Sequence, residues 1–243
     1  LNEYEAMSPA FINKSGLTIA FIGSSDIDGR ESNEQPYLDS GYNKPGFYKI
    51  NKENIVRQIE NIDSVSDIII MEIHSGTEYS VEPRFFEGED ENYNPFFTEP
   101  TRENIELRHY AIDAGVDLVI NHHPHVLQGI ELYNGKLIAH SLGNFVFDQK
   151  FPETWQTVIL NSEIDQTGFS RHWIQPVFIQ NYIPKPATGK LSHRILDNLA
   201  YKSRKLDTYL YVDYENEFAE VLFNPENQMS NVFYIILDTL EIN

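Results

Sequence analysis

Cysteine is absent from the 243 residues, which excludes disulfides and thiolate zinc sites. Any metal ion would have to be held by histidine nitrogen and by carboxylate or amide oxygen. Basic residues are scarce as well, since 18 Lys and Arg stand against 37 Asp and Glu, a net charge of −19. This charge repels phosphate backbones, so we expect no nucleic-acid partner. It would equally repel a polyanionic substrate unless cations intervene.

Long apolar runs are also missing. No stretch approaches the ~20 residues that cross a bilayer, and the first residues do not resemble a signal peptide. The hydrophobic share of 41% and the aromatic share of 13% argue against disorder. We therefore expect a folded protein of one large domain, or of one domain with a small appendage. Residue 1 is Leu and not Met, so we expect the chain to be a trimmed or processed part of a longer protein.

Short apolar runs alternate with amphipathic segments in the first part of the chain. The runs predict three buried strands, over residues 17–22, 67–74 and 117–120. Asn51 is expected to cap a helix after the first strand, and a second helix is expected to start at Thr98 and Pro100 and to end at Gly115. The nearly continuous apolar run at 67–74 is typical of a parallel sheet that helices cover on both faces.

The second part of the chain predicts hairpins. Asn134-Gly135 between two apolar arms is the strongest short signal for a type I′ turn. A further hairpin is expected around 165–168, with arms at 155–164 and 169–175, and a separate strand at 177–183. A helix is then expected over about 192–206, followed by strands around Leu210, Val221 and residues 233–240.

Two stretches lack a clear period. Residues 28–49, rich in Gly, Pro, Asn and Tyr, are long enough to be a functional lid or a disordered loop. Residues 78–106 mix acidic and aromatic side chains. Such a charge run is usually a solvated face, and the aromatics leave open a substrate-lining loop or a subunit contact.

Histidines gather where two predicted strands end. His74 closes one strand, and His122, His123 and His125 follow the next. Ligands of open α/β sheets collect at the carboxyl ends of strands, and imidazole is the commonest transition-metal donor. Pro124 is expected to keep His123 extended, so that His123 and His125 point to one side and His122 to the other. The alternative is a polar loop whose histidines cap backbone carbonyls.

The predicted hairpin aims Asn144 back beside this histidine loop. Its amide could donate to a substrate oxygen or ligate a metal, and it could equally hold its own turn together. His109 is interpreted as a surface or packing residue and His140 as a structural one, while His172 and His193 are isolated.

Three segments then carry a resemblance to a known family. LTIAFIG at 17–23, IHSGTEY at 73–79 and the stretch 111–148, with HHPHVLQGIELYNGKLIAHSLGNF inside it, resemble the CapA-type proteins of poly-γ-glutamate capsule synthesis, the PGA_cap family. That family is similar to the calcineurin-like metallophosphoesterases. The resemblance implies an α/β fold, a partial αββα sandwich with mixed sheets. It divides the chain into a C-terminal portion of that domain at 1–183 and a helix-plus-strands α+β extension at 184–243.

The resemblance also implies a site. Two divalent metal ions, of Mn, Zn, Fe or Mg, would be bound with His74, His123 and His125 as ligands, while His122 would be exposed or support a ligand. Asn144 and Glu78 would orient the substrate or an imidazole N–H. The Gly-Asp, Asn-Glu and Asn-Asn-His blocks of the family do not occur upstream of Leu17. An N-terminal segment or another chain would therefore complete the site, or the chain would bind one metal or none.

The implied function is capsule biosynthesis at the outer face of the cell envelope. The site would perform hydrolase or transferase chemistry on a phosphoester, an amide or the end of an anionic polymer, with other capsule-synthesis membrane proteins as partners. Two alternatives remain open. One is a non-enzymatic accessory protein of capsule export or anchoring with an incomplete metal site, and the other is a general metal-dependent phosphodiesterase.

Overall fold

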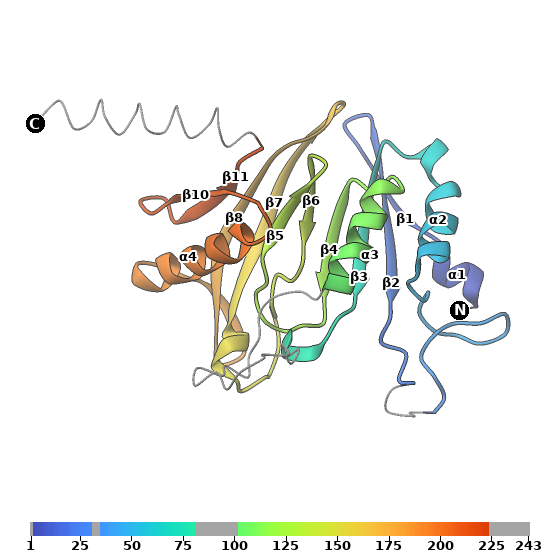
Figure 1. Ribbon diagram of the computed structural model, residues 1–243, viewed down its shortest axis with the longest axis horizontal. Coiled ribbons are helices and arrows are strands. Elements are labelled where there is room, and N and C mark those ends of the chain that lie inside the picture. The colour runs from blue at the N-terminus through green and yellow to red at the C-terminus, as the bar shows by residue number, and fades with distance from the viewer. Residues whose placement is uncertain (1, 31–34, 81–101, 224–243) are drawn as a thin grey trace, which may run out of the picture.

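The computed structural model describes residues 2–30, 35–80 and 102–223. Two β-sheets pack on each other in this part of the chain, and helices cover the outer face of the first sheet (Figure 1). The first sheet has the strand order β1-β2-β3-β4-β6-β5. Its strands, in chain order, are β1 Ala10–Lys14, β2 Leu17–Ser25, β3 Ile68–His74, β4 Leu118–His122, β5 Ile130–Tyr133 and β6 Lys136–Ala139. Strands β2, β3, β4 and β6 are parallel, and β1 and β5 run antiparallel to their neighbours.

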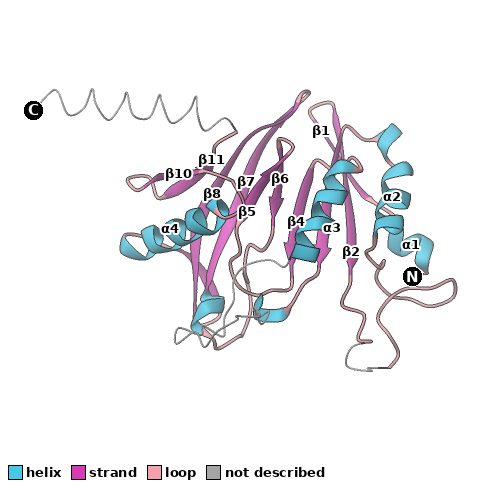
Figure 2. Cartoon of the chain, viewed as in Figure 1, coloured by secondary structure: helices cyan, strands magenta, loops and turns pink. Residues whose placement is uncertain are grey.

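The second sheet is antiparallel at every described pairing. Its strands are β7 Gln156–Asp165, β8 Gly168–Gln180, β9 Ile183–Pro186, β10 Leu210–Asp213 and β11 Phe218–Val221. The helices, shown in cyan in Figure 2, are α1 Glu3–Met7, α2 Lys52–Glu60, α3 Arg102–Asp113 and α4 Lys190–Arg204, with 3-10 turns η1 Asp63–Val65, η2 Glu78–Ser80 and η3 Pro152–Trp155. None of the described helices is both long and apolar enough to cross a membrane.

Strand alternation divides the core between the two faces of the first sheet. Met71 and Val119 point towards α2 and α3, where Ile55, Ile59 and Ala111 pack against them. Their neighbours along β3 and β4 point the other way, towards the second sheet. Each fully buried aliphatic side chain contributes roughly 1.5–3 kcal/mol relative to an exposed one. The near-continuous apolar strands in the sequence are explained by this burial on both faces.

Helix α4 closes the edge of the first sheet at β5. The backbone N–H of Ile130 donates to Ser203 Oγ at 2.9 Å, and that of Leu132 donates to Thr208 Oγ1 at 2.7 Å. Lys202 Nζ donates to the carbonyl of Leu127 at 2.6 Å. Side chains near the end of α4 therefore satisfy backbone groups that an edge strand would leave open.

The expected α/β class with two sheets and a mixed first sheet is confirmed. Helix α2 begins after its Asn51 cap, whose side chain accepts the N–H of Asn54. The type I′ hairpin is confirmed too, with positive φ at Asn134 and Gly135. The separate strand expected at 177–183 is wrong. Strand β8 runs through Pro176, whose carbonyl accepts the N–H of Ala187, so the sheet tolerates a proline at this position.

Some expectations lie outside the described residues. These are the helix start at Thr98 and Pro100, the strand at 233–240, and most of the acidic and aromatic stretch 78–106. The division of the chain at residue 183 stays a prediction. Strand β11 pairs with β8, so the segments before and after this residue share one sheet.

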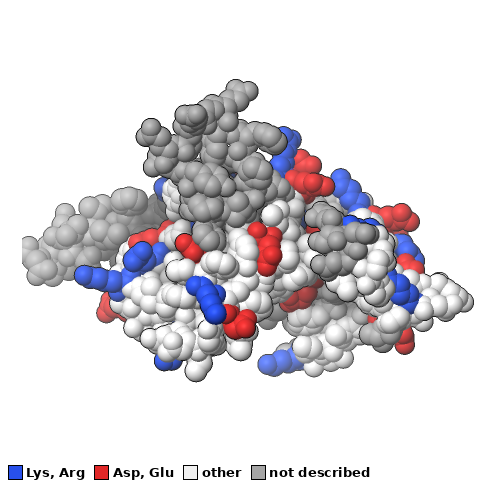
Figure 3. All heavy atoms as spheres, turned by 90° about the horizontal axis from the view of Figure 1, so that it is seen from below, with Lys and Arg blue, Asp and Glu red and all other residues white. Residues whose placement is uncertain are grey.

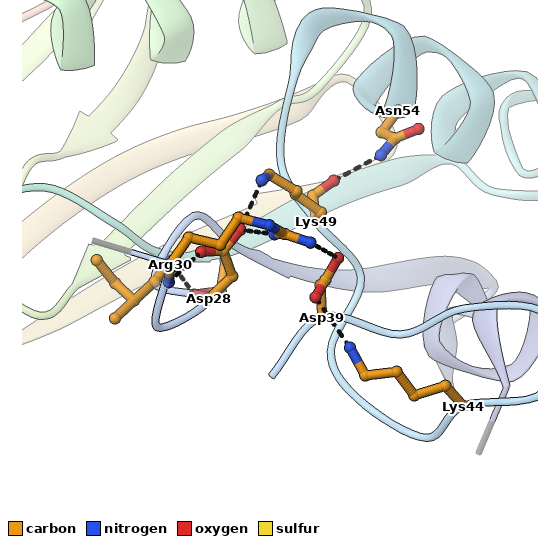
Figure 4. Close-up of polar contacts among 8 residues, drawn as sticks. Asp28, Arg30, Asp39, Lys44, Lys49 and Asn54 are labelled. Atoms are coloured by element: carbon orange, nitrogen blue, oxygen red, sulfur yellow. Dashed lines mark hydrogen bonds and ion pairs between the residues drawn. The ribbon is translucent and has the colours of Figure 1, made fainter. Parts of the chain in front are cut away.

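Ion pairs organise the described part of the excursion at 28–49 (Figure 4). The Asp28 carboxylate accepts from Arg30 and, at 2.6 Å, from Lys49 Nζ. The hydrogen bond from Lys49 is the main reason why the pKa of Asp28 falls to about 2. Asp39 accepts from Arg30 and Lys44, each at 3.0 Å. The described part of this segment is therefore folded back on itself, next to the end of β2.

Candidate metal centre

Three parallel strands deliver the candidate residues to one edge of the first sheet. Ser25, His74 and His122 are register neighbours at the ends of β2, β3 and β4. A cavity of about 560 Å³ lies between these strand ends, the loop after β6, and β7. We call it the histidine cavity, because His74, His122, His123 and His125 line it together with Asn144.

The imidazoles of the three predicted ligands converge. The ring centroids of His74 and His123 are 4.7 Å apart, and those of His123 and His125 are 5.8 Å apart. The fourth imidazole of the cavity, His122, donates from Nε2 to Glu72 Oε2 at 2.7 Å. The prediction that His122 points to the opposite side is wrong, because it is still part of β4 and lies beside His74 in the register. That His74, His123 and His125 bind metal stays a prediction.

The histidine loop turns more sharply than the sequence suggests. His123 has φ +94° and His125 has φ +60°, so the predicted extended conformation of His123 is wrong. Positive φ at a non-glycine residue costs on the order of 1–3 kcal/mol. The carbonyl of Pro124 accepts the N–H of Tyr79 at 2.9 Å, which ties the loop to η2. Strain of this kind is typical of residues held in place for a ligand.

Asn121 clamps the strand ends that carry the histidines. Its side chain is fully buried. The Nδ2 amide donates to the carbonyls of Ser75 at 3.1 Å, His122 at 2.9 Å and His140 at 3.0 Å, and Oδ1 accepts from Ser75 Oγ at 2.7 Å. One side chain thus joins the ends of β3, β4 and β6. These hydrogen bonds hold the strand ends from which the histidine loop starts.

The cavity lowers the proton affinity of two imidazoles. Burial, with the charges of His74 and His125 nearby, lowers the pKa of His123 to about 4. Burial and the nearby His122 and His125 also lower the pKa of His74. Both rings are therefore neutral at pH 7, and a neutral imidazole is the form that ligates a metal ion.

Asn144 fixes the orientation of His125. Asn144 Oδ1 lies 2.7 Å from His125 Nδ1, and Asn144 Nδ2 donates to Gln149 Oε1 at 2.9 Å. Gln149 in turn donates to the hydroxyl of Tyr79 at 3.0 Å. Glu78 Oε1 lies 3.5 Å from His125 Nε2, but Glu78 is not among the residues that line the cavity. Of the five predicted site residues, four line the cavity and Glu78 lies beside His125.

Sequence reasoning missed a buried polar network behind the cavity. Arg108 on α3 is almost fully buried and donates to His140 Nδ1 at 2.7 Å and to Ser75 Oγ at 3.3 Å. His140 Nε2 donates to Glu131 Oε2 at 2.8 Å, and His109 Nε2 lies 2.5 Å from Glu131 Oε1. The structural role predicted for His140 is confirmed, and His109, predicted to be a surface or packing residue, stacks on the ring of Tyr133. Arg108 gave no signal, because an arginine in a helix usually reaches solvent.

The donor set can be tested against a metal site. Neutral imidazoles with one fixed tautomer are suitable donors for Zn, Mn or Fe. Within residues 2–30, 35–80 and 102–223, however, no three His, Asp or Glu side chains are arranged so as to hold an ion as they stand. The described histidines therefore do not form a complete metal site as they stand, and metal binding by them stays a prediction.

Comparison with known proteins identifies the family. Residues 92–149 match the family model described as bacterial capsule synthesis protein PGA_cap. The PGA biosynthesis protein CapA of Bacillus subtilis (strain 168) is 30% identical over 171 residues, which are 70% of this chain and 39% of that protein. The capsule biosynthesis protein CapA of Bacillus anthracis is 28% identical over 202 residues, 81% of this chain and 42% of that protein. The chain belongs to the PGA_cap family.

The matched part of the PGA_cap model contains His122, His123, His125 and Asn144, so the histidine cavity lies largely within it. The chain spans about two fifths of the length of the two CapA proteins. Among solved structures, a putative 5′-nucleotidase from Staphylococcus aureus aligns with a TM-score of 0.44 at 15% identity, over 79% of this chain and 33% of that one. A hypothetical protein from Thermus thermophilus aligns with a TM-score of 0.34 at 12% identity, over 73% of this chain and 58% of that one.

Proposed function

We propose that this chain carries part of a metal-dependent hydrolase or transferase site of capsule biosynthesis. The observation that supports it most is the convergence of His74, His123 and His125 in one cavity at the strand ends. Membership of the PGA_cap family supports the capsule role, since the named relatives are capsule and PGA biosynthesis proteins. We further propose the cell envelope as its place of action, with other capsule-synthesis proteins as partners.

The residues of the cavity have separate tasks in this proposal. His74 and His123, neutral at pH 7, would offer lone pairs to the metal ions. His125 would do so through Nε2, because Asn144 engages its Nδ1. Bound divalent metal would polarise the scissile group and activate a water molecule. Glu78, whose Oε1 lies 3.5 Å from His125 Nε2, would orient the substrate.

The charge of the protein supports a role for cations. A net charge of −19 repels an anionic polymer or a phosphoester. On the face seen along the ends of β2 to β4, acidic and basic side chains are interspersed and are not sorted by sign (Figure 3). Divalent ions in the histidine cavity would therefore supply the local positive charge that such a substrate needs.

Metal content and hydrolysis together test this proposal. The purified chain is dialysed against Mn²⁺, and the bound metal is counted by mass spectrometry; hydrolysis of bis(p-nitrophenyl) phosphate is measured in the same samples. We expect bound Mn²⁺ and slow hydrolysis, both lost in His123→Ala and kept in His193→Ala, a variant outside the cavity. Absence of bound metal in the wild type would refute metal binding by His74, His123 and His125 in this chain.

A non-enzymatic accessory role in capsule export or anchoring is the second candidate. It is favoured by one observation, that no described group of three His, Asp or Glu side chains is arranged to hold an ion. Metal stoichiometry separates the two candidates. Two tightly held ions per chain favour the enzyme, and none favours the accessory protein.

A further inference from the structure

The histidine cavity has two chemically different sides. Imidazoles and Asn144 form one side, and the other consists of Leu142, Phe145, Val146, Phe147, Ile159 and Leu160. We call the second side the apolar wall. None of the described residues lining the cavity is Lys, Arg, Asp or Glu. A site for an anionic polymer alone would not need such a wall.

Several side chains of the apolar wall are exposed to solvent. Val146 is 75% exposed, Phe145 48% and Phe147 41%, although the three are consecutive in the chain. Ile159, on β7, is exposed by 38%. Contiguous exposed apolar side chains next to a polar cluster are typical of a ligand site. The cavity volume of about 560 Å³ lies within the usual range for small-molecule ligands.

Backbone contacts fix the start of this wall at Leu142 and Gly143. The carbonyl of Leu142 accepts from the N–H of Val158 at 3.3 Å and from Thr157 Oγ1 at 2.7 Å. Gly143 has φ +80°, and a Cβ atom there would lie 2.8 Å from the carbonyl oxygen of Gln156. The segment therefore lies directly on the start of β7. A wall that is already formed loses little conformational entropy when a ligand binds.

The apolar wall also touches the histidines. The rings of Phe147 and His125 are 4.9 Å apart between centroids. A ligand whose reacting group reaches His125 would place its next atoms against Phe147 and the neighbouring residues. The uncharged wall, in a protein of net charge −19, favours an uncharged apolar group at this position.

We propose that the histidine cavity takes an amphiphile, with a phosphate or similar polar head at the imidazoles and an aliphatic chain along the apolar wall. This inference rests on the proposed function for the role of the head group and adds the class of substrate. The occupant of the wall is the tail of a small molecule. A second copy of the chain or another protein surface on the wall would contradict the proposal.

Alkyl phosphates of increasing length provide the test. Binding of methyl, butyl, hexyl and octyl phosphate to the full chain is measured by titration calorimetry with Mn²⁺ present, below the concentrations at which the probes form micelles. We expect affinity to rise about two- to fourfold for each added methylene, the gain for carbon removed from water. Val146→Ser should flatten this rise. Val65→Ser, at a valine of η1 that is 56% exposed, is the matched control and should keep it.

Equal affinity for methyl and octyl phosphate, or the same rise in Val146→Ser as in the wild type, would overturn the proposal. Failure of the proposed function gives a different result. In that case no metal binds, yet the affinity still rises with the length of the alkyl group when Mn²⁺ is left out. Sedimentation of the same samples shows whether the protein is a dimer. If the wild type is a dimer and Val146→Ser is a monomer, a second copy of the chain covers the wall, which would also overturn the proposal.

Discussion

Asn144 Oδ1 and His125 Nδ1 lie 2.7 Å apart, although the two residues come from different loops. An amide oxygen only accepts hydrogen bonds, so the proton of a neutral His125 sits on Nδ1. The lone pair of that ring is then on Nε2, on the other side of the imidazole. A hydrogen bond to the second nitrogen of a ligating histidine fixes its tautomer and raises its basicity.

Removal of this bond should weaken metal binding without unfolding the protein. We expect Asn144→Ala to lower the affinity for Mn²⁺ by about 10–100-fold, the usual effect of losing such a partner. Titration calorimetry measures the affinity. Asn161→Ala, at a partly exposed asparagine of β7, is the control and should bind as the wild type does. Wild-type affinity in Asn144→Ala would show that Asn144 only holds its own turn.

Arg108 should be essential for stability. Its guanidinium is buried, and burial lowers its pKa to about 9, so it remains charged at neutral pH. Arg108→Met would leave Glu131 buried without the cation that His140 connects to it. Removing one partner of a buried charge pair typically costs about 3–5 kcal/mol. Urea denaturation measures this loss. Arg102→Met, whose side chain is 92% exposed in the wild type, should change the free energy of unfolding by less than about 0.5 kcal/mol.

Stability should fall between pH 6.5 and pH 4. Burial lowers the pKa of His140 and of His172 from 6.5 to about 4. In that window the unfolded chain binds protons that the folded chain does not, so the free energy of unfolding decreases as the pH falls. At pH 4, each of these histidines lowers the free energy of unfolding by about 3 kcal/mol. The Asp28 carboxylate, with its pKa of about 2, matters only at lower pH.

His172→Phe isolates one of these two contributions. His172 packs against the rings of Phe169 and Phe223, so phenylalanine should fit among them. The free energy of unfolding, measured by denaturation at pH values from 7.5 to 4.5, should fall less with decreasing pH in this variant than in the wild type. Identical pH dependence in the two proteins would show that His172 does not titrate as its burial implies.

Two glycines with similar backbones should respond differently to alanine. Gly135 has φ +76° and open space around it, whereas a Cβ on Gly143 would lie 2.8 Å from Gln156 O. Gly135→Ala should lower the free energy of unfolding by about 1 kcal/mol, because of the positive φ alone. Gly143→Ala should cost clearly more and should also weaken Mn²⁺ binding, because Asn144 follows it directly. Equal losses of stability in thermal unfolding would show that the loop can move away from β7.

The sequence predicted most of the first sheet because its signals are local. Continuous apolar runs, the Asn51 cap and the Asn134-Gly135 turn each determine structure within a few residues. The convergence of His74 with His123 followed from a general rule, that parallel strands end at one edge. His122 lies in the same cavity because it pairs with His74 in the strand register. This pairing between strands cannot be deduced from the residues around Pro124, so the predicted direction of His122 was wrong.

Long-range burial explains what sequence reasoning missed. Arg108 is buried because Ser75 and His140, which follow β3 and β6, lie against it together with Asn104 of its own helix. Strand β8 continues through Pro176 because its partner strands supply the remaining bonds. The exposure of Phe145 to Phe147 also depends on how the loop lies on β7, and a short apolar triplet gives no sign of it.

Mn²⁺ affinity in single-histidine variants tests the central claim most directly. The wild type and four variants are titrated with Mn²⁺ in the calorimeter at pH 7.5. The variants are His74→Ala, His123→Ala, His125→Ala and, as a control outside the cavity, His193→Ala. The account predicts that each cavity variant loses at least about tenfold in affinity, while the control binds as tightly as the wild type. Affinities that are the same in all five proteins would contradict a metal site formed by His74, His123 and His125.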